Sequence, residues 1–331
     1  MVDTNINTST HQHINTFLAC DWGTSSFRLA LVSLDGDIKE VVSNNRGIAA
    51  TFREWKERSG SDADRFNYYL NIIRTGIAEI ESRLGVTLQD VPLVISGMAS
   101  SSIGMMNLPY GKIPFALDGS DLAIHHEAAT ENFPHATLLI SGVRSDNDVM
   151  RGEETQLVGV TQDYASKSDH LFIFPGTHSK HIRIADGKAL AFTTYMTGEF
   201  FDVLTKNSIL ADSVMGNSTL HERDNLENFK EGVLEGVNGN LLNSTFHVRT
   251  RGLLGGRSKE ANYFFLSGLL IGSELRGVSG DVTIVGGEFI SECYEEALRV
   301  LGVSNVARID GAQAVIKGQA RIVQRNRPIQ P

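Results

Sequence analysis

The feature that most constrains the fold of this 331-residue chain is a meander of three short strands that occurs twice. In the first copy, residues 17–43, an apolar strand leads into the turn Gly23-Thr24-Ser25, and an Asp-Gly turn joins the next two strands. The second copy, residues 171–194, has Gly176-Thr177 and another Asp-Gly turn at the corresponding places. The same order of strands and turns at two places indicates an internal repeat.

A second pair of segments supports this repeat. Residues 91–98 and residues 282–289 are each a short apolar strand that ends at glycine. A stretch with helical patterning precedes each of them, at Asp62–Leu84 and Asn262–Arg276. The sequence therefore predicts an α/β fold of two halves, each a β-meander with flanking helices, that face one cleft.

The repeat predicts an N-terminal domain at residues 17–142 and a C-terminal domain at residues 143–331. Residues 197–260 have helical patterning without a counterpart in the first half, so we interpret them as an insertion on the substrate side. Residues 1–16 are polar, and we expect a disordered tail there. The last helix is rich in small residues and is expected to pack at a hinge, against a helix that opens near residues 100–104.

Composition excludes several classes of function. The net charge of −9 argues against a nucleic-acid partner, which requires a basic face. The longest apolar run, residues 263–272, is too short to span a bilayer, and the N-terminal residues have no apolar signal segment. The two cysteines have no metal-ligand spacing and are typical of buried thiols in a reducing compartment. We therefore expect a cytoplasmic protein that binds neither nucleic acid nor membrane.

The two glycine-hydroxyl turns suit phosphate binding. Glycine lets the backbone approach an anion, and successive amides with Ser and Thr hydroxyls donate to phosphoryl oxygens. Asp21 ends a buried strand beside the first turn, where a ligand of Mg²⁺ or of its water shell belongs. The chain has neither a GxxxxGK[ST] loop nor a GxGxxG fingerprint, so elimination also favours a nucleotide site built from two hairpins.

Four segments resemble one family of sugar-acid kinases: DVMRGEETQLVG (148–159), PGTHSKH (175–181), MTGEF (196–200) and FLSGLLIGSE (265–274). Together they resemble the 2-dehydro-3-deoxygalactonokinase family, within the actin/hexokinase/Hsp70 superfamily. The resemblance implies duplicated ribonuclease-H-like domains, each with a mixed five-stranded sheet flanked by helices. It also implies transfer of the ATP γ-phosphate, with Mg²⁺, to the 6-hydroxyl of 2-dehydro-3-deoxy-D-galactonate in galactonate degradation.

The resemblance also implies roles for individual residues. Asp21 would organise Mg²⁺, and Thr197 and Glu199 would line the sugar pocket, although Thr197 could instead cap the following helix. The glycine pair 286–287 would lie against the adenosine. The remaining phosphate contacts would come from the two hairpins: Gly23, Thr24, Ser25, Gly176, Thr177, His178 and Lys180.

The acceptor hydroxyl needs a carboxylate that takes its proton. The candidates are Asp148, Glu153 and Glu154. Related carbohydrate kinases have the base at the start of a helix that runs toward a glycine, and Glu153 matches that position best. Acidic residues also stabilise the first turn of any helix, which is the competing interpretation. Arg151 suits the substrate carboxylate, with a solvated surface arginine as its alternative.

Two other functions remain open at this point. The chain could phosphorylate a different sugar or sugar acid of the same superfamily, or bind nucleotide without catalysis as actin relatives do. ATP and a small sugar acid are the expected partners, and a homodimer is compatible with the sequence.

Overall fold

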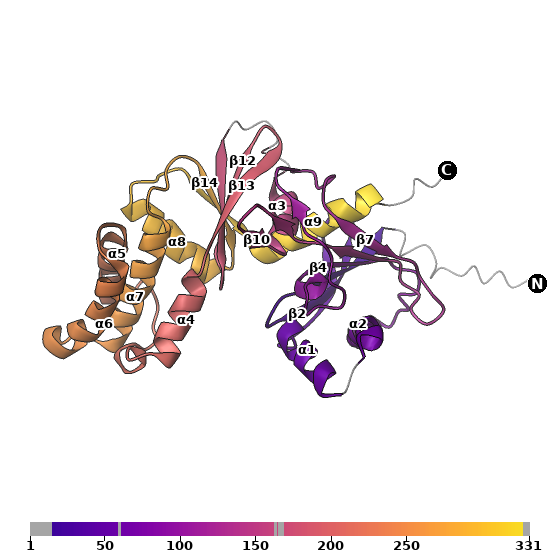
Figure 1. Cartoon of the computed structure of the whole chain (residues 1–331), viewed down its shortest axis with the longest axis horizontal. Coiled ribbons are helices and arrows are strands. Elements are labelled where there is room, and N and C mark those ends of the chain that lie inside the picture. Colours follow the sequence, from indigo (N-terminus) through magenta and orange to yellow (C-terminus); the bar gives the residue numbers. More distant parts are fainter. Residues whose placement is uncertain (1–14, 59–60, 162–163, 165–168, 327–331) are drawn as a thin grey trace, which may run out of the picture. The chain divides into compact units, whose positions relative to one another are not determined.

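The computed structural model describes residues 15–58, 61–161, 164 and 169–326 (Figure 1). The predicted tail at residues 1–16 therefore lies outside the described residues except for its last two. The chain forms two compact units. Unit 1 comprises residues 1–166, 187–189 and 312–331, and unit 2 comprises residues 167–186 and 190–311.

The observed division differs from the expected boundary at residues 142/143. Strands β9 (Val143–Arg144) and β10 (Val149–Met150) and helix α3 (Glu153–Val160) belong to unit 1. The last helix, α9 (Gly311–Asn326), also belongs to unit 1 from residue 312 onward. The acidic segment that precedes the second hairpin is thus part of the first unit.

The sheet of unit 1 has the strand order β3-β2-β1-β4-β8-β7. Strands β1, β2 and β3 form the predicted antiparallel meander, β4 and β8 run parallel to β1, and β7 is antiparallel at the far edge. The strands are β1 (Thr16–Trp22), β2 (Phe27–Ser33), β3 (Ile38–Asn44), β4 (Leu93–Gly97), β7 (Ile124–Glu127) and β8 (Thr137–Ile140). A separate small sheet joins β9 and β10 to β5 (Gly111–Lys112).

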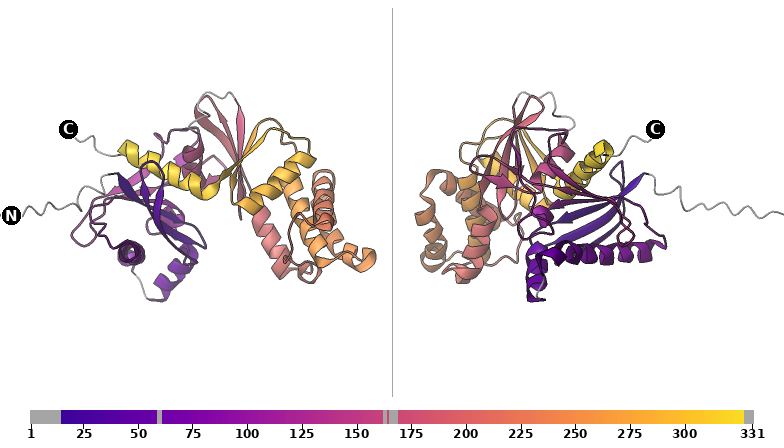
Figure 2. Two further views of the ribbon diagram at one scale, coloured as in Figure 1. Left: turned by 180° about the vertical axis from the view of Figure 1, so that it is seen from behind. Right: turned by 45° about the vertical axis from the view of Figure 1, so that its right-hand side comes forward.

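Helices α1 (Ile48–Glu57) and α2 (Asp62–Leu84) contribute to the core of this unit, and the views of Figure 2 show α2 running along the sheet. Apolar residues at helical spacing on α2, such as Ile73, Ile77 and Ile80, are buried together with β1 residues. Helix α2 ends at Gly85, which adopts the left-handed conformation of a helix C-cap. The helix predicted at residues 62–84 is therefore confirmed at both ends.

The sheet of unit 2 repeats the first five-strand arrangement. Its order is β15-β14-β11-β12-β13-β6, so a meander of β11, β12 and β13 is followed by the parallel strands β14 and β15. The strands are β11 (His170–Phe174), β12 (Ser179–Ala185), β13 (Lys188–Tyr195), β14 (Val282–Gly286) and β15 (Val306–Asp310). This topology confirms the predicted duplication.

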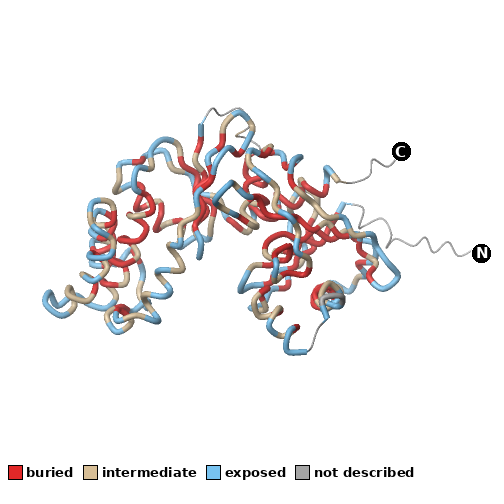
Figure 3. Tube along the Cα trace, viewed as in Figure 1, coloured by how far each residue is buried: buried red, intermediate tan, exposed pale blue. Residues whose placement is uncertain are grey.

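Each sheet has a sixth strand beyond the expected five, and it is added at opposite edges. In unit 1 the extra strand is β7, beside β8. The other sheet gains β6 (Phe115–Ala116), which pairs with Lys188 and Ala189 at the start of β13, residues that cluster with unit 1. The central strands of both sheets are buried (Figure 3).

The segment interpreted as an insertion, residues 197–260, is helical and lies in unit 2. It comprises α4 (Thr197–Asn207), the short helix η3 (Ala211–Ser213), α5 (Arg223–Asn238), α6 (Leu241–Gly255) and the start of α7 (Lys259–Glu274), and α5, α6 and α7 lie side by side in Figures 1 and 2. A Cβ on Gly232 or Gly236 of α5, or on Gly268 or Gly272 of α7, would lie within 2.3 Å of a backbone oxygen of the other helix. These glycines allow the two helices to pack in backbone contact.

The small residues of α9 do not pack where the sequence predicted. Residues 98–100 form only a single turn of 3₁₀ helix, and the partner of α9 is α3 instead. A Cβ on Gly318 would lie 1.9 Å from the carbonyl oxygen of Thr155, and a Cβ on Gly159 would lie 2.0 Å from that of Ala314. No helix opens at residues 100–104 for α9 to pack against, and the glycine contacts of α9 are with α3, the helix of the acidic segment.

The described helices include none that is both long and apolar enough to cross a membrane. Both cysteines, Cys20 and Cys293, are free and buried, and burial raises the pKa of each thiol, that of Cys293 to about 12. The prediction that both cysteines are buried is confirmed.

Candidate active site

The first hairpin, Gly23–Ser26, connects β1 to β2 and is closed by a hydrogen bond of 2.9 Å from the amide of Gly23 to the carbonyl of Ser26. The first turn of α1 holds it, because the amides of Ile48 and Ala49 donate to the carbonyls of Gly23 and Thr24 at 3.0 and 3.1 Å. A Cβ on Gly47 would lie 2.4 Å from Thr24 O. Thr24 and Ser25 stay exposed, so their hydroxyls and amides can meet a ligand.

Asp21 precedes this hairpin and pairs across the meander with Arg28. Burial raises the pKa of its carboxyl, the charge of Arg28 opposes that rise, and the charge of Glu153 adds to it. Asp21 and Arg28 also line a largely polar cavity of about 520 Å³, together with Ser26, Phe27, Ser43, Asn44 and Asn45. An acid that lines a polar cavity next to an exposed turn is suited to a hydrated cation.

Two glycines let the acidic segment approach Asp21. Gly152 caps α3 with a φ of 110°, which favours glycine, and a Cβ there would lie 3.5 Å from the Cα of Gly97. Gly97 ends β4, and a Cβ on it would lie 3.5 Å from Oδ1 of Asp21. The sequence did not assign Gly97 to the site, although it ends the apolar strand at residues 91–98 that is repeated at residues 282–289.

The three candidate bases differ in their surroundings. Glu154 is 1% exposed and accepts hydrogen bonds from the amide of Gly152 and from Thr155, and burial followed by the charge of Glu153 raises its pKa to about 7. Glu153 is half-buried and accepts from the amide of Arg151 at 3.0 Å. Asp148 accepts from the amide of Val149 at 2.7 Å.

Arg151 is held by neighbours that sequence analysis missed. Its guanidinium donates to the carbonyl of Ser100 at 2.8 Å and to the Ser100 hydroxyl, and it lies 4.3 Å from the ring centroid of Tyr110. Its Nε is buried without a hydrogen-bond partner. The side chain is therefore fixed rather than solvated.

The second hairpin, Gly176–Ser179, connects β11 to β12 in unit 2. Glu199, in the first turn of α4, donates its amide to the carbonyl of Thr177 at 3.0 Å, and a Cβ on Gly198 would lie 2.4 Å from Gly176 O. Gly176, Thr177 and His178 are exposed. The start of a helix thus holds the second hairpin, as it does the first.

Side chains around the second hairpin are engaged with one another. His178 pairs with Glu199, and the buried Lys180 donates its ammonium to the carbonyl of His178 at 2.8 Å. Thr197 is the first residue of α4, does not cap the helix, and donates its hydroxyl to the buried Glu274. Capping by Thr197 is therefore wrong. Glu274 is the last residue of the FLSGLLIGSE segment, which resembles the family. The sequence assigned no role to Glu274, although this motif pointed to it.

Beside this hairpin, unit 2 has a cavity of about 170 Å³. Its walls are mostly aromatic and aliphatic: Gly176, Thr197, Gly198, Phe201, Tyr263, Ser267, Leu270, Ile271, Phe289, Ile290 and Tyr294. Gly287 caps α8 (Glu288–Val300) nearby in sequence, and no atom lies within 4 Å of where its Cβ would be. A flat apolar group suits such a cavity.

A family model described as 2-keto-3-deoxy-galactonokinase matches residues 21–322, which include both hairpins and the acidic segment. The chain belongs to the 2-keto-3-deoxy-galactonokinase family. The family, the enzyme class and the α/β fold expected from the sequence are thereby confirmed.

Relatives agree with this assignment. The "Probable 2-dehydro-3-deoxygalactonokinase DgoK1" of Rhizobium meliloti (strain 1021) is 32% identical over 313 residues, 91% of this chain and 94% of the relative. The 2-dehydro-3-deoxygalactonokinase of Escherichia coli (strain K12) is 30% identical over 246 residues, 71% of this chain and 80% of that protein. A crystal structure from Sinorhizobium meliloti, described as a candidate 2-dehydro-3-deoxygalactonokinase, superimposes with a TM-score of 0.78 at 28% identity, covering 95% of this chain and 98% of the other.

Within this kinase family, the structure brings the predicted residues into two groups. Unit 1 gathers Asp21, the first hairpin and the acidic segment around Gly97. Unit 2 gathers the second hairpin, the MTGEF segment and the apolar cavity. No cluster of three or more His, Cys, Asp or Glu side chains in the described ranges is arranged to hold a metal ion by itself.

Proposed function

We propose that this kinase transfers the γ-phosphoryl group of ATP to the 6-hydroxyl of 2-dehydro-3-deoxy-D-galactonate, a step of galactonate catabolism. The observation that carries the proposal is the family match over residues 21–322. In the in-line reaction the sugar oxygen bonds to phosphorus, the bond from phosphorus to the β-γ bridging oxygen breaks, and ADP leaves. The hydroxyl proton goes to a carboxylate of the chain.

The nucleotide roles follow from the two hairpins and the apolar cavity. The exposed residues Thr24 and Ser25 suit donation to phosphoryl oxygens through their amides and hydroxyls, and Gly23, whose own amide closes the hairpin, would let the phosphates approach the backbone. In the second hairpin the exposed Gly176, Thr177 and His178 would have the same role. Lys180 would act on the phosphates through the hairpin that its ammonium braces. The purine would enter the aromatic-lined cavity, with Gly287 leaving room for the ribose. Gly286 would belong to the same turn, where a Cβ would lie 3.2 Å from Oγ of Ser291.

Asp21 is the proposed Mg²⁺ ligand. Mg²⁺ in kinases is held by one or two carboxylates, phosphate oxygens and waters, so a single acid in a polar cavity fits this ion. When bound, the ion would offset charge on the β- and γ-phosphates. The nearby charge of Glu153, which raises the pKa of Asp21, is a further reason for a cation here.

Glu153 is the proposed general base. Glu154 is almost fully buried and already accepts hydrogen bonds from the amide of Gly152 and the hydroxyl of Thr155. It therefore has little access to a substrate. Asp148 lies at the far end of the β9–β10 hairpin, before the turn that Gly152 makes toward Gly97. Glu153→Gln should lower kcat by about 100-fold or more while nucleotide affinity is kept. Asp148→Asn and Glu154→Gln serve as matched controls, and a larger loss in either would transfer the role to it.

The substrate contacts are proposed from the same segments. Arg151 would bind the sugar-acid carboxylate, since Ser100 and Tyr110 hold its guanidinium in place. Thr197 and Glu199 would contact the sugar through the lone pairs that remain free of Glu274 and His178. A cytoplasmic location, where ATP is available, agrees with the two free thiols. A homodimer remains a prediction, which light scattering would test.

The deciding experiment is a coupled ADP-release assay with ATP, Mg²⁺ and a panel of acceptors. The panel contains 2-dehydro-3-deoxy-D-galactonate, its C4 epimer and neutral hexoses. Turnover should be highest with the first compound. Turnover only with a neutral hexose would show a different sugar kinase, and no turnover with any acceptor would remove the catalytic proposal.

A further inference from the structure

One buried carboxylate in unit 2 collects four hydrogen bonds. Glu274 is the last residue of α7, and its side chain is 1% exposed. Its Oε1 accepts from the hydroxyl of Ser179 at 2.6 Å and from Nε2 of His181 at 2.9 Å. Its Oε2 accepts from the hydroxyl of Thr197 and from that of Tyr294 at 2.6 Å. Each oxygen is therefore the acceptor of two donors.

This arrangement is costly to bury and depends on all its members. A carboxylate removed from water is tolerated only when charged or polar partners satisfy its lone pairs. If the acceptor is removed, up to four donors lose their partner together, and each buried donor without a partner is unfavourable. Glu274 is thus suited to fix the relative positions of the segments that donate to it.

Those segments surround the proposed nucleotide site. Ser179 and His181 begin β12, directly after the exposed part of the second hairpin. Thr197 begins α4, and the next residue, Gly198, lies against the carbonyl of Gly176. Thr197 and Tyr294 also line the 170 Å³ cavity. The carboxylate therefore lies behind both the phosphate-facing turn and the cavity wall.

The state of Tyr294 supports a fixed network. Its pKa is raised well above the usual value, first by burial and then by the charge of Glu274. Its hydroxyl consequently keeps its proton and remains a donor to Glu274 over the whole range in which a kinase works.

We propose that Glu274 is a positioning residue that holds the second hairpin and the cavity wall in the arrangement that binds ATP. It touches no reacting atom, and it acts through Ser179, Thr197 and Tyr294. The inference rests on the proposed function, because it assigns the cavity and the hairpin to the nucleotide. It places Glu274 in control of nucleotide affinity, which ADP binding measures without the sugar.

The test is ADP binding to the full-length chain with Mg²⁺, measured by isothermal titration calorimetry, for Glu274→Gln. The variant keeps the shape of the side chain but replaces one carboxylate oxygen by an amide NH2 group. This group is a donor, and it would face two other donors in place of an acceptor. ADP binding should weaken by about 10-fold or more, which corresponds to the loss of roughly one hydrogen bond. The KM for ATP should rise by the same factor.

Tyr294→Phe is the milder second variant, because it keeps the ring in the cavity wall and removes one donor. It should weaken ADP binding by about 3-fold to 5-fold. Glu296→Gln is the matched control, since Glu296 is also a buried glutamate of unit 2 but pairs with Lys230 and Arg299 and does not line the cavity. It should leave ADP binding unchanged.

Unaltered ADP binding in both Glu274→Gln and Tyr294→Phe would overturn the inference. An equal loss in Glu296→Gln would do the same, because it would indicate general destabilisation. If the wild-type chain binds ADP but phosphorylates no sugar acid, the proposed acceptor fails while the binding data still decide the role of Glu274. If the wild-type chain binds no ADP, both proposals fail.

Discussion

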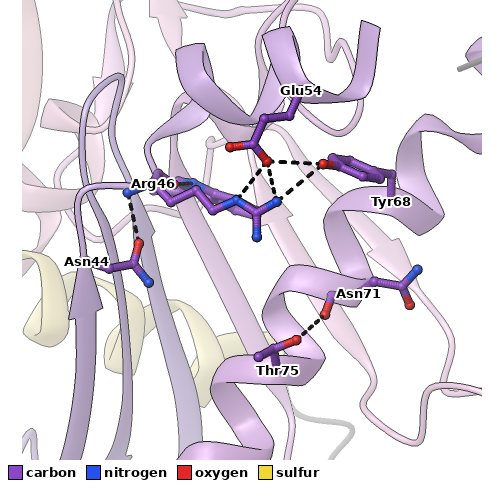
Figure 4. A network of polar contacts seen from close by, with 7 residues as sticks. Asn44, Arg46, Glu54, Tyr68, Asn71 and Thr75 are labelled. Atoms are coloured by element: carbon purple, nitrogen blue, oxygen red, sulfur yellow. Dashed lines mark hydrogen bonds and ion pairs between the residues drawn. The ribbon is translucent and has the colours of Figure 1, made fainter. Parts of the chain in front are cut away.

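The two hairpins of the repeat have the same backbone support but different side-chain support. In each, the amide of a residue in the next helix's first turn donates to a hairpin carbonyl, and a glycine near that helix start leaves room for the turn. Around the first hairpin, the side chains of Arg46, Glu54 and Tyr68 form a half-exposed network (Figure 4). Around the second, the donors converge on the buried Glu274.

This difference separates the backbone support that the hairpin requires from the side-chain network that each half of the chain adds. The backbone bonds and the glycine occur in both halves, so we infer that they are what a hairpin of this kind requires. The network of Arg46 is half-exposed and joins the end of β3 to α1 and α2. Glu274 instead joins β12, α4 and α8. The second hairpin should therefore be much more sensitive to a single side-chain change.

The shared support gives the largest expected effect. Gly47→Ala and Gly198→Ala would each introduce a Cβ 2.4 Å from a hairpin carbonyl oxygen, a distance at which the hairpin must move. Because phosphoryl transfer depends on placement within fractions of an ångström, kcat/KM should fall by about 100-fold or more in both variants. Steady-state kinetics with saturating Mg²⁺ would measure the loss.

Gly255→Ala is the control for this pair. Gly255 ends α6, and no atom lies within 4 Å of where its Cβ would be. Its kcat/KM should equal that of the wild type. A strong loss in only one of the two hairpin variants would show that the repeat does not use its two turns in the same way.

The buried support gives the next largest effect, on stability. Glu274→Ala removes the common acceptor of four donors and leaves them buried, so the free energy of unfolding should fall by about 4 kcal/mol. Urea denaturation followed by circular dichroism would measure it. A loss below about 1 kcal/mol would mean that the donors find other partners and that this buried network contributes little to the free energy of unfolding.

The same residues show which features of the fold and the site could be predicted from the sequence. The two Gly-Thr turns and their strands were predictable, because turn residues and apolar runs are local signals. Glu274 was inside a segment that resembles the family, but its role needs four donors from distant parts of the chain. Gly97 was likewise hidden, since a close approach between two backbones has no local signature. Close helix packing at Gly318 was expected, but its partner α3 was not. The compact units divide elsewhere than at residues 142/143 for a related reason: α3 follows β10 in sequence but packs on α9.

A comparison of the two buried glutamates predicts a pH dependence. Glu154, in unit 1, has a pKa raised to about 7 by burial and then by the charge of Glu153, whereas four donors surround Glu274. A raised pKa means that the folded state binds the proton more tightly than the unfolded state. Glu154 therefore stabilises the fold most below pH 4.5, and this contribution is lost as the pH rises toward 7, by about 3 kcal/mol in all.

Unfolding free energies between pH 4.5 and 7.5 would check this sign. Glu154→Gln should reduce the downward slope with rising pH. Some slope should remain, because burial also raises the pKa of Asp21. An unchanged slope in the variant would show that Glu154 is not the group that titrates.

The exposed support gives the smallest effect and the sharpest contrast with Glu274. Arg46 and Glu54 are 38% and 41% exposed, and such pairs contribute roughly 0–1 kcal/mol. Glu54→Ala should therefore lower stability by less than about 1 kcal/mol, and by still less in ~1 M salt, where the pair is screened. Turnover should change little, because the hairpin bonds come from the amides of Ile48 and Ala49 rather than from the Arg46 side chain. If Glu54→Ala instead costs as much as Glu274→Ala, burial is not what distinguishes the two supports, and the first hairpin depends on its ion pair as strongly as the second depends on its carboxylate.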